Sequence, residues 1–169
     1  IVKPDIGERG TLVEKVESDA ALQAYHEQMQ VPYLLQAYVD YPVELGVFYY
    51  RMPGTSKGRV SSIVVKDLLS ITGDGQHSLA ELIRLDDRAK LQEDALADRF
   101  ADQWEEVLPA GEELLLMPIG NHSRGTTFLN GNAHIDDTLC ATFDALADQI
   151  EGFYFGRFDL RCASIASLR

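Results

Sequence analysis

The sequence is poor in cysteine and lacks the features of secreted and membrane-spanning chains. Its two cysteines, Cys140 and Cys162, form no Cys-x-x-Cys pair, a pattern typical of reduced, packed thiols in a cytosolic protein. No run of about 18 or more apolar residues and no basic leader ahead of an apolar segment is present. We therefore predict a cytoplasmic protein with no disulfide framework, no membrane span and no signal peptide.

Basic clusters are absent as well. The chain holds 15 Lys and Arg against 27 Asp and Glu, a net charge of −12, which excludes nucleic acid as an expected partner. Motifs of P-loop proteins, Gly-x-Ser-x-Gly hydrolases, His-Glu-x-x-His zinc enzymes and protein kinases are missing. An acidic chain can still bind a nucleotide, because a few convergent cations and Mg²⁺ set the local potential while distant charges are screened within roughly 10 Å.

Apolar periodicity predicts an α+β protein. Of the 169 residues, 46% are apolar and 25% charged, which fits one globular domain with a sizeable core. Hairpins outnumber β-α-β units, which favours a largely antiparallel sheet with packed helices. We expect strands at residues 1–3, 11–16, 33–39, 43–51, 59–66, 114–119 and 153–160.

Helix-start signals mark the segments between these strands. Ser18 is a predicted N-cap, and Ser78 with Glu81 is a predicted capping box. The tight turn Gly73-Asp74-Gly75 comes just before the capping box, and its glycines are interpreted as shaping the turn. Beyond these starts, the spacing predicts one long helix over 86–107, a polar loop over 120–132 and a helix over 139–150.

The order of several short motifs resembles the nucleotide-binding part of ATP-grasp enzymes, in particular the carboxylate-amine ligases related to cyanophycin synthetase and D-alanine-D-alanine ligase. The resemblance covers nearly the whole chain, and its specificity comes from the order of motifs that are weak singly. The motifs are Lys3-Pro4 with a loop to Gly10, the hinge Gln36 to Val39, Glu44, Lys66 before Gly73-Asp74-Gly75, Glu81-Leu82-Ile83, Asp87-Arg88, Asn121 with Gly125, and Asp159.

The resemblance implies an ATP-grasp fold with a small lid subdomain at residues 1–40 and a larger subdomain at 41–169. It also implies ATP and Mg²⁺ as cofactors and a C–N-forming ligase, in which the γ-phosphoryl group moves to a carboxylate and an amine attacks the acyl phosphate. The implied substrate is a small amino acid or peptide, and a homo-oligomer is compatible with it. We expect a piece of a longer protein, because the last strand has no partner and a Glu and an Asn of the family's metal site have no match.

Eight residues are implied to hold the nucleotide. In the family, the lysine and the glycine loop contact phosphates, the hinge backbone contacts adenine, and a glutamate holds the ribose hydroxyls. The corresponding residues are Lys3, Gly7, Gly10, Gln36, Ala37, Tyr38, Val39 and Glu44. Glu8 and Arg9 depart from the family's usual Gly- and Ser-rich loop, and an ordinary hairpin turn stays open as an alternative.

The remaining implied site residues belong to the larger subdomain. Lys66 and Arg157 are the implied catalytic cations, and Asp159 is the implied Mg²⁺ ligand. Asn121 and Arg124 are the implied substrate contacts, since an Arg guanidinium can hold a carboxylate through two hydrogen bonds. For each residue a surface or ion-pair role stays open, and His122, which fits no metal-ligand spacing, is interpreted as structural.

Two other functions stay open beside the ligase. One is a nucleotide-binding sensor or scaffold without catalysis, and the other is an acidic α+β protein with no nucleotide site. The nucleotide hypothesis requires Lys3, Glu44 and Asp159, which are far apart in the sequence, to converge around one triphosphate.

Overall fold

The computed structural model describes residues 1–7 and 10–169, and these residues form two compact units, Ile1–Asp40 and Tyr41–Arg169. Their identification as the lid and the larger subdomain of an ATP-grasp enzyme stays a prediction. No helix among the described residues is long and apolar enough to cross a membrane.

The first unit pairs two short strands and adds one helix. Its elements are β1 (Val2–Pro4), α1 (Asp19–Gln28) and β2 (Tyr33–Leu35), and the two strands are antiparallel. Ser18 caps α1 as predicted, because its hydroxyl accepts a hydrogen bond from the N–H of Ala21 at 3.1 Å. Val2 and Tyr25 are the buried apolar residues of this unit.

Two predicted strands of the first unit were wrong or too long. Over 11–16 only Glu14 makes an isolated bridge, to Val2. Gly10 and Leu12 have φ values of 71° and 58°, and this left-handed backbone cannot continue an extended strand. The strand predicted over 33–39 ends at Leu35, which pairs with Val2, the first residue of β1.

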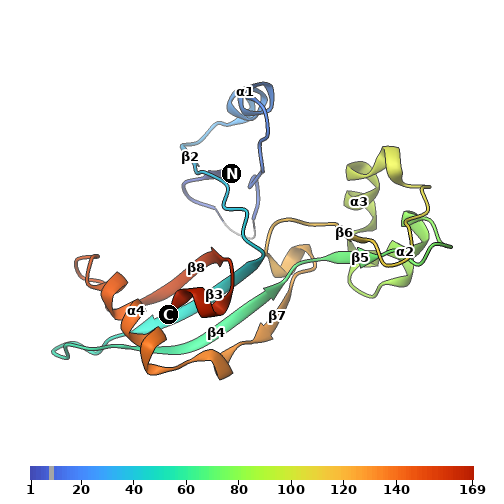
Figure 1. Cartoon of the computed structure of the whole chain (residues 1–169). Helices are drawn as coiled ribbons and strands as arrows, with labels where there is room; N and C mark the ends of the chain where they lie inside the picture. Colours follow the sequence, from blue (N-terminus) through green and yellow to red (C-terminus); the bar gives the residue numbers. More distant parts are fainter. Residues whose placement is uncertain (8–9) are drawn as a thin grey trace. The chain divides into compact units, whose positions relative to one another are not determined.

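The second unit is built on a four-stranded antiparallel sheet of order β7-β4-β3-β8. Its strands are β3 (Val43–Tyr50), β4 (Arg59–Asp67), β7 (Thr127–Asn130) and β8 (Phe155–Cys162). The helix α4 (Asp137–Ala147) lies along the sheet (Figure 1). Its residues Leu139, Phe143 and Ala147, spaced by four, are buried against one face of β3 and β4.

Beside this sheet, the same unit holds a second apolar cluster. It is formed by β5 (Ser70–Thr72), α2 (Leu79–Leu85), η1 (Ala89–Gln92), α3 (Glu93–Arg99), η2 (Ala101–Gln103) and β6 (Glu113–Leu115). The capping box of α2 is confirmed, since Ser78 and Glu81 bond each other's backbone N–H groups. Leu69, Leu79, Ile83, Leu96 and Leu116 are fully buried in the cluster.

The long helix predicted over 86–107 was wrong. A continuous helix of 22 residues would extend about 33 Å away from its start. Instead the chain breaks into η1, α3 and η2 and returns to α2, where the N–H of Ala80 donates to the carbonyl of Trp104 at 2.9 Å. The apolar residues of this segment lie on short helical turns that pack around one cluster. Their spacing in the sequence is the same as that expected for one straight helix, so periodicity does not distinguish the two arrangements.

The predicted loop over 120–132 is only partly a loop. It contains η3 (His122–Arg124) and the strand β7, whose Phe128 pairs with Lys66 of β4, and η4 (Asn132–His134) follows β7. The last element is η5 (Ile165–Leu168). Every strand pair among the described residues is antiparallel, so the predicted α+β class with a largely antiparallel sheet is confirmed.

The turn Gly73-Asp74-Gly75 has a structural role. Asp74 Oδ1 accepts hydrogen bonds from the N–H groups of Gln76 and His77 at 2.8 and 2.9 Å. The backbone and side chain of His77 and the backbone of Gln76 hold the pKa of Asp74 well below its usual value, and Asp74 in turn raises the pKa of His77. Gly75, at φ 75°, supplies the left-handed residue of the turn.

Tyr49 provides a stability test of the sheet. It is fully buried, its hydroxyl donates to Asp144 Oδ1 of α4 at 2.5 Å, and burial followed by this bond raises the pKa of Tyr49 to about 12. The folded state holds the Tyr49 proton more tightly than the unfolded state does. The stabilisation that comes from protonated Tyr49 is therefore fully present below the ordinary pKa of 10.0 and is lost as pH rises toward 12. We expect the free energy of unfolding to fall by on the order of 2 kcal/mol over that window.

Denaturant unfolding at the two ends of this pH window measures the loss. Tyr49→Phe, which has no proton to lose, should remove the part of the fall that belongs to Tyr49. An identical fall in the parent protein and the variant would contradict the assignment.

Candidate functional site: a charged sheet face

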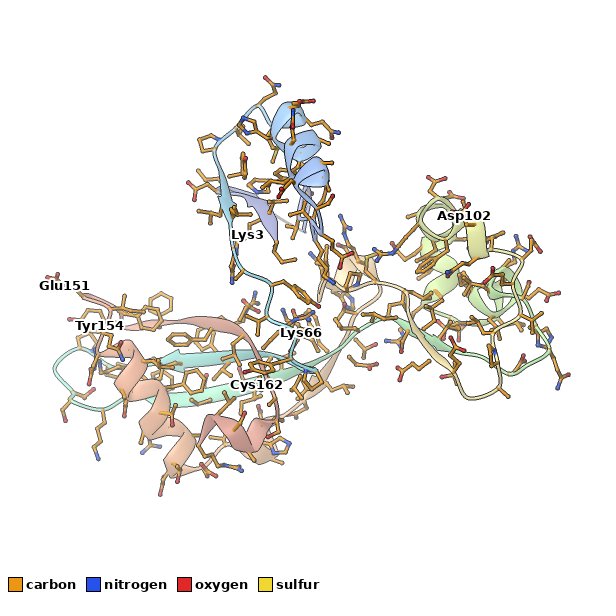
Figure 2. The ribbon with its side chains drawn as sticks, turned by 45° about the horizontal axis from the view of Figure 1, so that its top comes forward. Lys3, Lys66, Asp102, Glu151, Tyr154 and Cys162 are labelled. Carbon is orange, nitrogen blue, oxygen red and sulfur yellow. The ribbon has the colours of Figure 1, made fainter. Side chains whose placement is uncertain are left out.

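One face of the four-stranded sheet is apolar and the other is charged. Glu44 of β3 pairs in register with Lys66 of β4 and Arg161 of β8, and Gly46 pairs with Asp159. Because side chains alternate along a strand, these charged residues lie opposite the apolar cluster that α4 covers. Figure 2 shows Lys66 on this side of the sheet and Cys162 on the α4 side.

Lys66 is the centre of the charged face. Its Nζ donates to Glu44 Oε1 at 2.9 Å and lies 3.1 Å from Asp159 Oδ1. The side chains of Lys66 and Glu44 are only 11% and 15% exposed, so this pair is largely removed from water. A cation held in this way is fixed in position and acts through a lower effective dielectric than a surface lysine.

Two arginines of β8 complete the network. Arg157 Nε lies 2.8 Å from Asp159 Oδ2. The side chain of Arg157 is 60% exposed, whereas that of Arg161 is 15% exposed. Arg161 binds Glu44 Oε2 through Nε at 3.1 Å and Nη2 at 2.9 Å, and its Nη2 also donates to the Pro118 carbonyl at 2.9 Å. The network thus holds three cations and two carboxylates, a local positive excess on a chain of net charge −12.

A pocket of about 280 Å³ opens on this face. That volume is near the lower end of the range for ligand sites, roughly 300–1,000 Å³, and suits a reacting group rather than a whole nucleotide. Its lining comes from β3, β4, β7, β8, the first residue of η3 and the two residues before η3: Gly46, Val64, Lys66, Gly120, Asn121, His122, Phe128, Arg157 and Asp159.

Two glycines permit this packing. A Cβ on Gly120 would lie 2.2 Å from Glu44 Oε1 and 2.8 Å from Lys66 Cδ, so only glycine allows the segment to cross directly over the ion pair. A Cβ on Gly46 would lie 3.3 Å from Arg157 Cδ and would narrow the pocket. Neither glycine was singled out from the sequence, because the partners that each approaches are distant along the chain.

The two implied substrate residues are placed differently. Asn121 lines the pocket, and its Oδ1 accepts hydrogen bonds from the N–H and hydroxyl of Ser123 at 3.0 and 2.9 Å, which caps η3. Arg124 is not among the described residues that line the pocket, and its Nη1 lies 4.0 Å from Met117 Sδ. A role for Arg124 in holding a substrate carboxylate stays a prediction.

In the first unit, the predicted phosphate-binding residues gather in a separate concavity. This concavity of about 320 Å³ is lined by Lys3, Pro4, Asp5, Gly7, Gly10, Thr11, Val13 and Leu34. Lys3 Nζ donates to Gln36 Oε1 at 3.0 Å, which joins two of the predicted nucleotide residues. Glu8 and Arg9, the two residues that depart from the family's loop pattern, lie outside the described residues.

The predicted adenine-binding segment Gln36, Ala37, Tyr38 and Val39 follows β2 as irregular backbone. Lys15 Nζ lies 4.5 Å from the ring centroid of Tyr38. The adenine role of the segment stays a prediction, as does the ribose role of Glu44. Both carboxylate oxygens of Glu44 already accept hydrogen bonds from cations, so the visible task of Glu44 is to fix Lys66 and Arg161.

The donor set decides how a magnesium ion can be held. No group of three or more His, Cys, Asp or Glu side chains suited to a metal occurs among residues 1–7 and 10–169. Asp159 is 43% exposed and is the accessible carboxylate of the pocket. This set does not fit a metal held by the protein alone, but it fits Mg²⁺ that arrives with nucleotide phosphates and takes one protein carboxylate.

Sequence reasoning missed Arg161, Gly46 and Gly120 and set His122 aside. One signal for Arg161 was present: Arg157, Asp159 and Arg161 alternate along one strand and therefore share a face. The glycines and His122 become part of the site only through pairing between distant segments.

Among known proteins, similarity to this chain is found in solved structures. No protein-family profile and no curated protein matches it. The crystal structure of a bifunctional glutathione synthetase from Pasteurella multocida is similar over 97% of this chain and 24% of its own, with 13% sequence identity and a TM-score of 0.46. The chain thus spans about a quarter of that protein. A TM-score of 0.46 does not establish a shared fold.

Proposed function

We propose that the charged sheet face binds the reacting phosphates of ATP and that the protein is an ATP-dependent carboxylate-amine ligase of the ATP-grasp type. The observation that carries the proposal is the fixed, largely buried Lys66, which faces a pocket together with Arg157 and Asp159. Transfer of a phosphoryl group needs positioned cations more than covalent chemistry, because charge is spread over the phosphate oxygens in the transition state.

Four residues of the pocket, and Arg124 outside its lining, then have specific tasks. Lys66 and Arg157 stabilise the charge on the phosphoryl group as it moves to the carboxylate. Asp159 holds the Mg²⁺ that accompanies the nucleotide, and that ion neutralises phosphate charge. Asn121 contacts the acyl group from the rim of the pocket, and Arg124 orients a substrate carboxylate.

The first unit contributes a phosphate contact from Lys3 beside Gly7 and Gly10. Its segment Gln36, Ala37, Tyr38 and Val39 contacts adenine. Glu44 of the second unit contacts ribose through the remaining lone pairs of the oxygens that bind Lys66 and Arg161. The proposed substrate is an amino acid or a peptide in the cytoplasm, with no nucleic acid or membrane partner and with homo-oligomers allowed.

The second candidate function is a nucleotide sensor or scaffold without catalysis. One observation favours it. Asp159 Oδ1 and Oδ2 face Lys66 and Arg157, so Mg²⁺ must compete with two cations for the carboxylate. A protein of this kind would bind ATP without forming ADP.

ADP production distinguishes the two functions. The protein is incubated with Mg²⁺-ATP, with and without an equimolar mixture of the common L-amino acids and D-alanine, which supplies both carboxylate and amine. The ligase predicts ADP only with the mixture. It also predicts a loss of about 10²–10³-fold in Arg157→Ala, whereas Arg59→Ala, at the far end of β4, stays unchanged. Binding of ATP without any ADP would contradict the ligase, and absence of ATP binding would contradict both functions.

A further inference from the structure

His122 lies in the charged pocket with one ring nitrogen engaged. Its Nδ1 lies 3.2 Å from the carbonyl oxygen of Thr126. A carbonyl oxygen can only accept a hydrogen bond, so Nδ1 carries the proton and donates it. In the neutral ring, Nε2 is then an acceptor without a proton of its own.

The ring is held by its surroundings. The His122 and Phe128 ring centroids are 5.6 Å apart, and both residues line the pocket. The carbonyl of His122 accepts a hydrogen bond from the N–H of Gly125 at 3.1 Å, which closes the η3 turn. The ring of His122 is therefore positioned by Phe128 of β7, and its backbone is positioned by the η3 turn.

The pocket places this ring with the reacting groups. The charged residues that share the lining are Lys66 from β4 and Arg157 and Asp159 from β8. Lys66 and Arg157 are paired with carboxylates, and an ammonium or guanidinium group has donors but no acceptor lone pair. Asp159 accepts contacts from Lys66 and Arg157 on its two oxygens. His122 is thus the lining residue with a ring-nitrogen lone pair suited to accept a proton.

We propose that His122 is the general base that deprotonates the attacking amine in the ligation step. This inference rests on the proposed function. The ammonium group of the acceptor transfers one proton to Nε2. The neutral amine then attacks the acyl phosphate carbon, the new C–N bond forms, and the C–O bond to phosphate breaks. The departing phosphate takes the second nitrogen proton, and the imidazolium returns its proton to solvent.

The tautomer is the first test, and it needs no substrate. Long-range nitrogen-proton NMR of the ¹⁵N-labelled chain at mildly alkaline pH reports which ring nitrogen carries the proton. We expect the Nδ1–H form for His122, with the exposed His134 as the reference ring. An Nε2–H form would overturn the proposal, because Nε2 would then be a hydrogen-bond donor and could not accept the proton of the amine.

The second test separates the two halves of the reaction. Hydroxylamine is unprotonated at neutral pH, so it captures the acyl phosphate as a hydroxamate without needing a base. In His122→Gln, with Mg²⁺-ATP and the amino acid mixture, we expect hydroxamate within about twofold of the parent and amide lower by about 10²–10⁴-fold. The matched variant His134→Gln should match the parent in both.

The outcomes keep the two proposals apart. Equal losses of hydroxamate and amide in His122→Gln would assign His122 a positioning role and overturn the base. Absence of hydroxamate in the parent itself would refute the proposed function, and the base would then have no reaction to serve.

Discussion

Replacing Lys66 by methionine should lower ATP-dependent turnover by about 10²–10³-fold and weaken ATP binding, because the fixed cation that faces the phosphoryl group is lost. Glu44 and Asp159, which share Lys66 Nζ at 2.9 and 3.1 Å, would also lose the charge between them. Of the ion pairs in this network, Asp159 would then keep the one with Arg157, and Glu44 would keep the one with Arg161.

The same substitution should reduce stability. A largely buried ion pair that loses one partner leaves an uncompensated charge. Since Arg161 still binds Glu44, we expect a decrease of roughly 1–3 kcal/mol in the free energy of unfolding rather than the full effect. ADP production with the amino acid mixture, calorimetric titration with Mg²⁺-ATP and denaturant unfolding measure the effects on turnover, ATP binding and stability.

Lys57→Met is the matched control, because Lys57 lies in the turn between β3 and β4 and outside the charged pocket. Equal ATP affinity in Lys66→Met and Lys57→Met would show that Lys66 does not contact phosphate.

Gly73→Ala should be the most destabilising single-methyl change in the turn before α2. A Cβ at Gly73 would lie 2.3 Å from the carbonyl oxygen of Pro109 and 2.8 Å from that of Leu108. These are backbone atoms that cannot swing aside, and the N–H of Gly75 also bonds the Leu108 carbonyl at 3.0 Å. We expect a loss of about 3 kcal/mol, from overpacking plus displacement of the segment that joins η2 to β6.

Thermal and denaturant unfolding measure this loss, with Gly7→Ala as the control. At Gly7 the nearest atom to an added Cβ is 3.6 Å away, an ordinary contact, and alanine should be close to neutral. A Gly73→Ala variant as stable as Gly7→Ala would show that the turn can relax and that Gly73 does not fix it.

The strands and caps that local chemistry decides were predicted well from the sequence. Ser18 and the Ser78–Glu81 capping box act through bonds within one turn of helix, so neighbouring residues suffice to identify them. Strands β3, β4 and β8 were located because their apolar face repeats every second residue. The long helix over 86–107 was wrong and the loop over 120–132 was only partly right, because contacts with distant residues decide both segments: Ala80 with Trp104, and Lys66 with Phe128.

In the candidate site, too, the residues whose roles depend on contacts with distant segments could not be assigned from the sequence. Lys66, Arg157 and Asp159 were named from the resemblance, and the structure brings them together on one face of the sheet. Gly120 and His122 could not be assigned, because their roles depend on Glu44 and on the pocket wall, which lie far away in the sequence. Whether Lys3 meets Glu44 and Asp159 at one triphosphate stays a prediction.

The most direct measurement is an NMR titration of the labelled chain with Mg²⁺-ATP. The account predicts that the largest backbone amide shifts fall at the charged pocket, in Gly46, Lys66, Gly120, Asn121 and Asp159. A larger groove of about 1140 Å³ on the α4 side, which includes Lys57, Arg59 and Asp137, serves as the internal reference. Shifts confined to that groove, or none at saturating nucleotide, would contradict the account.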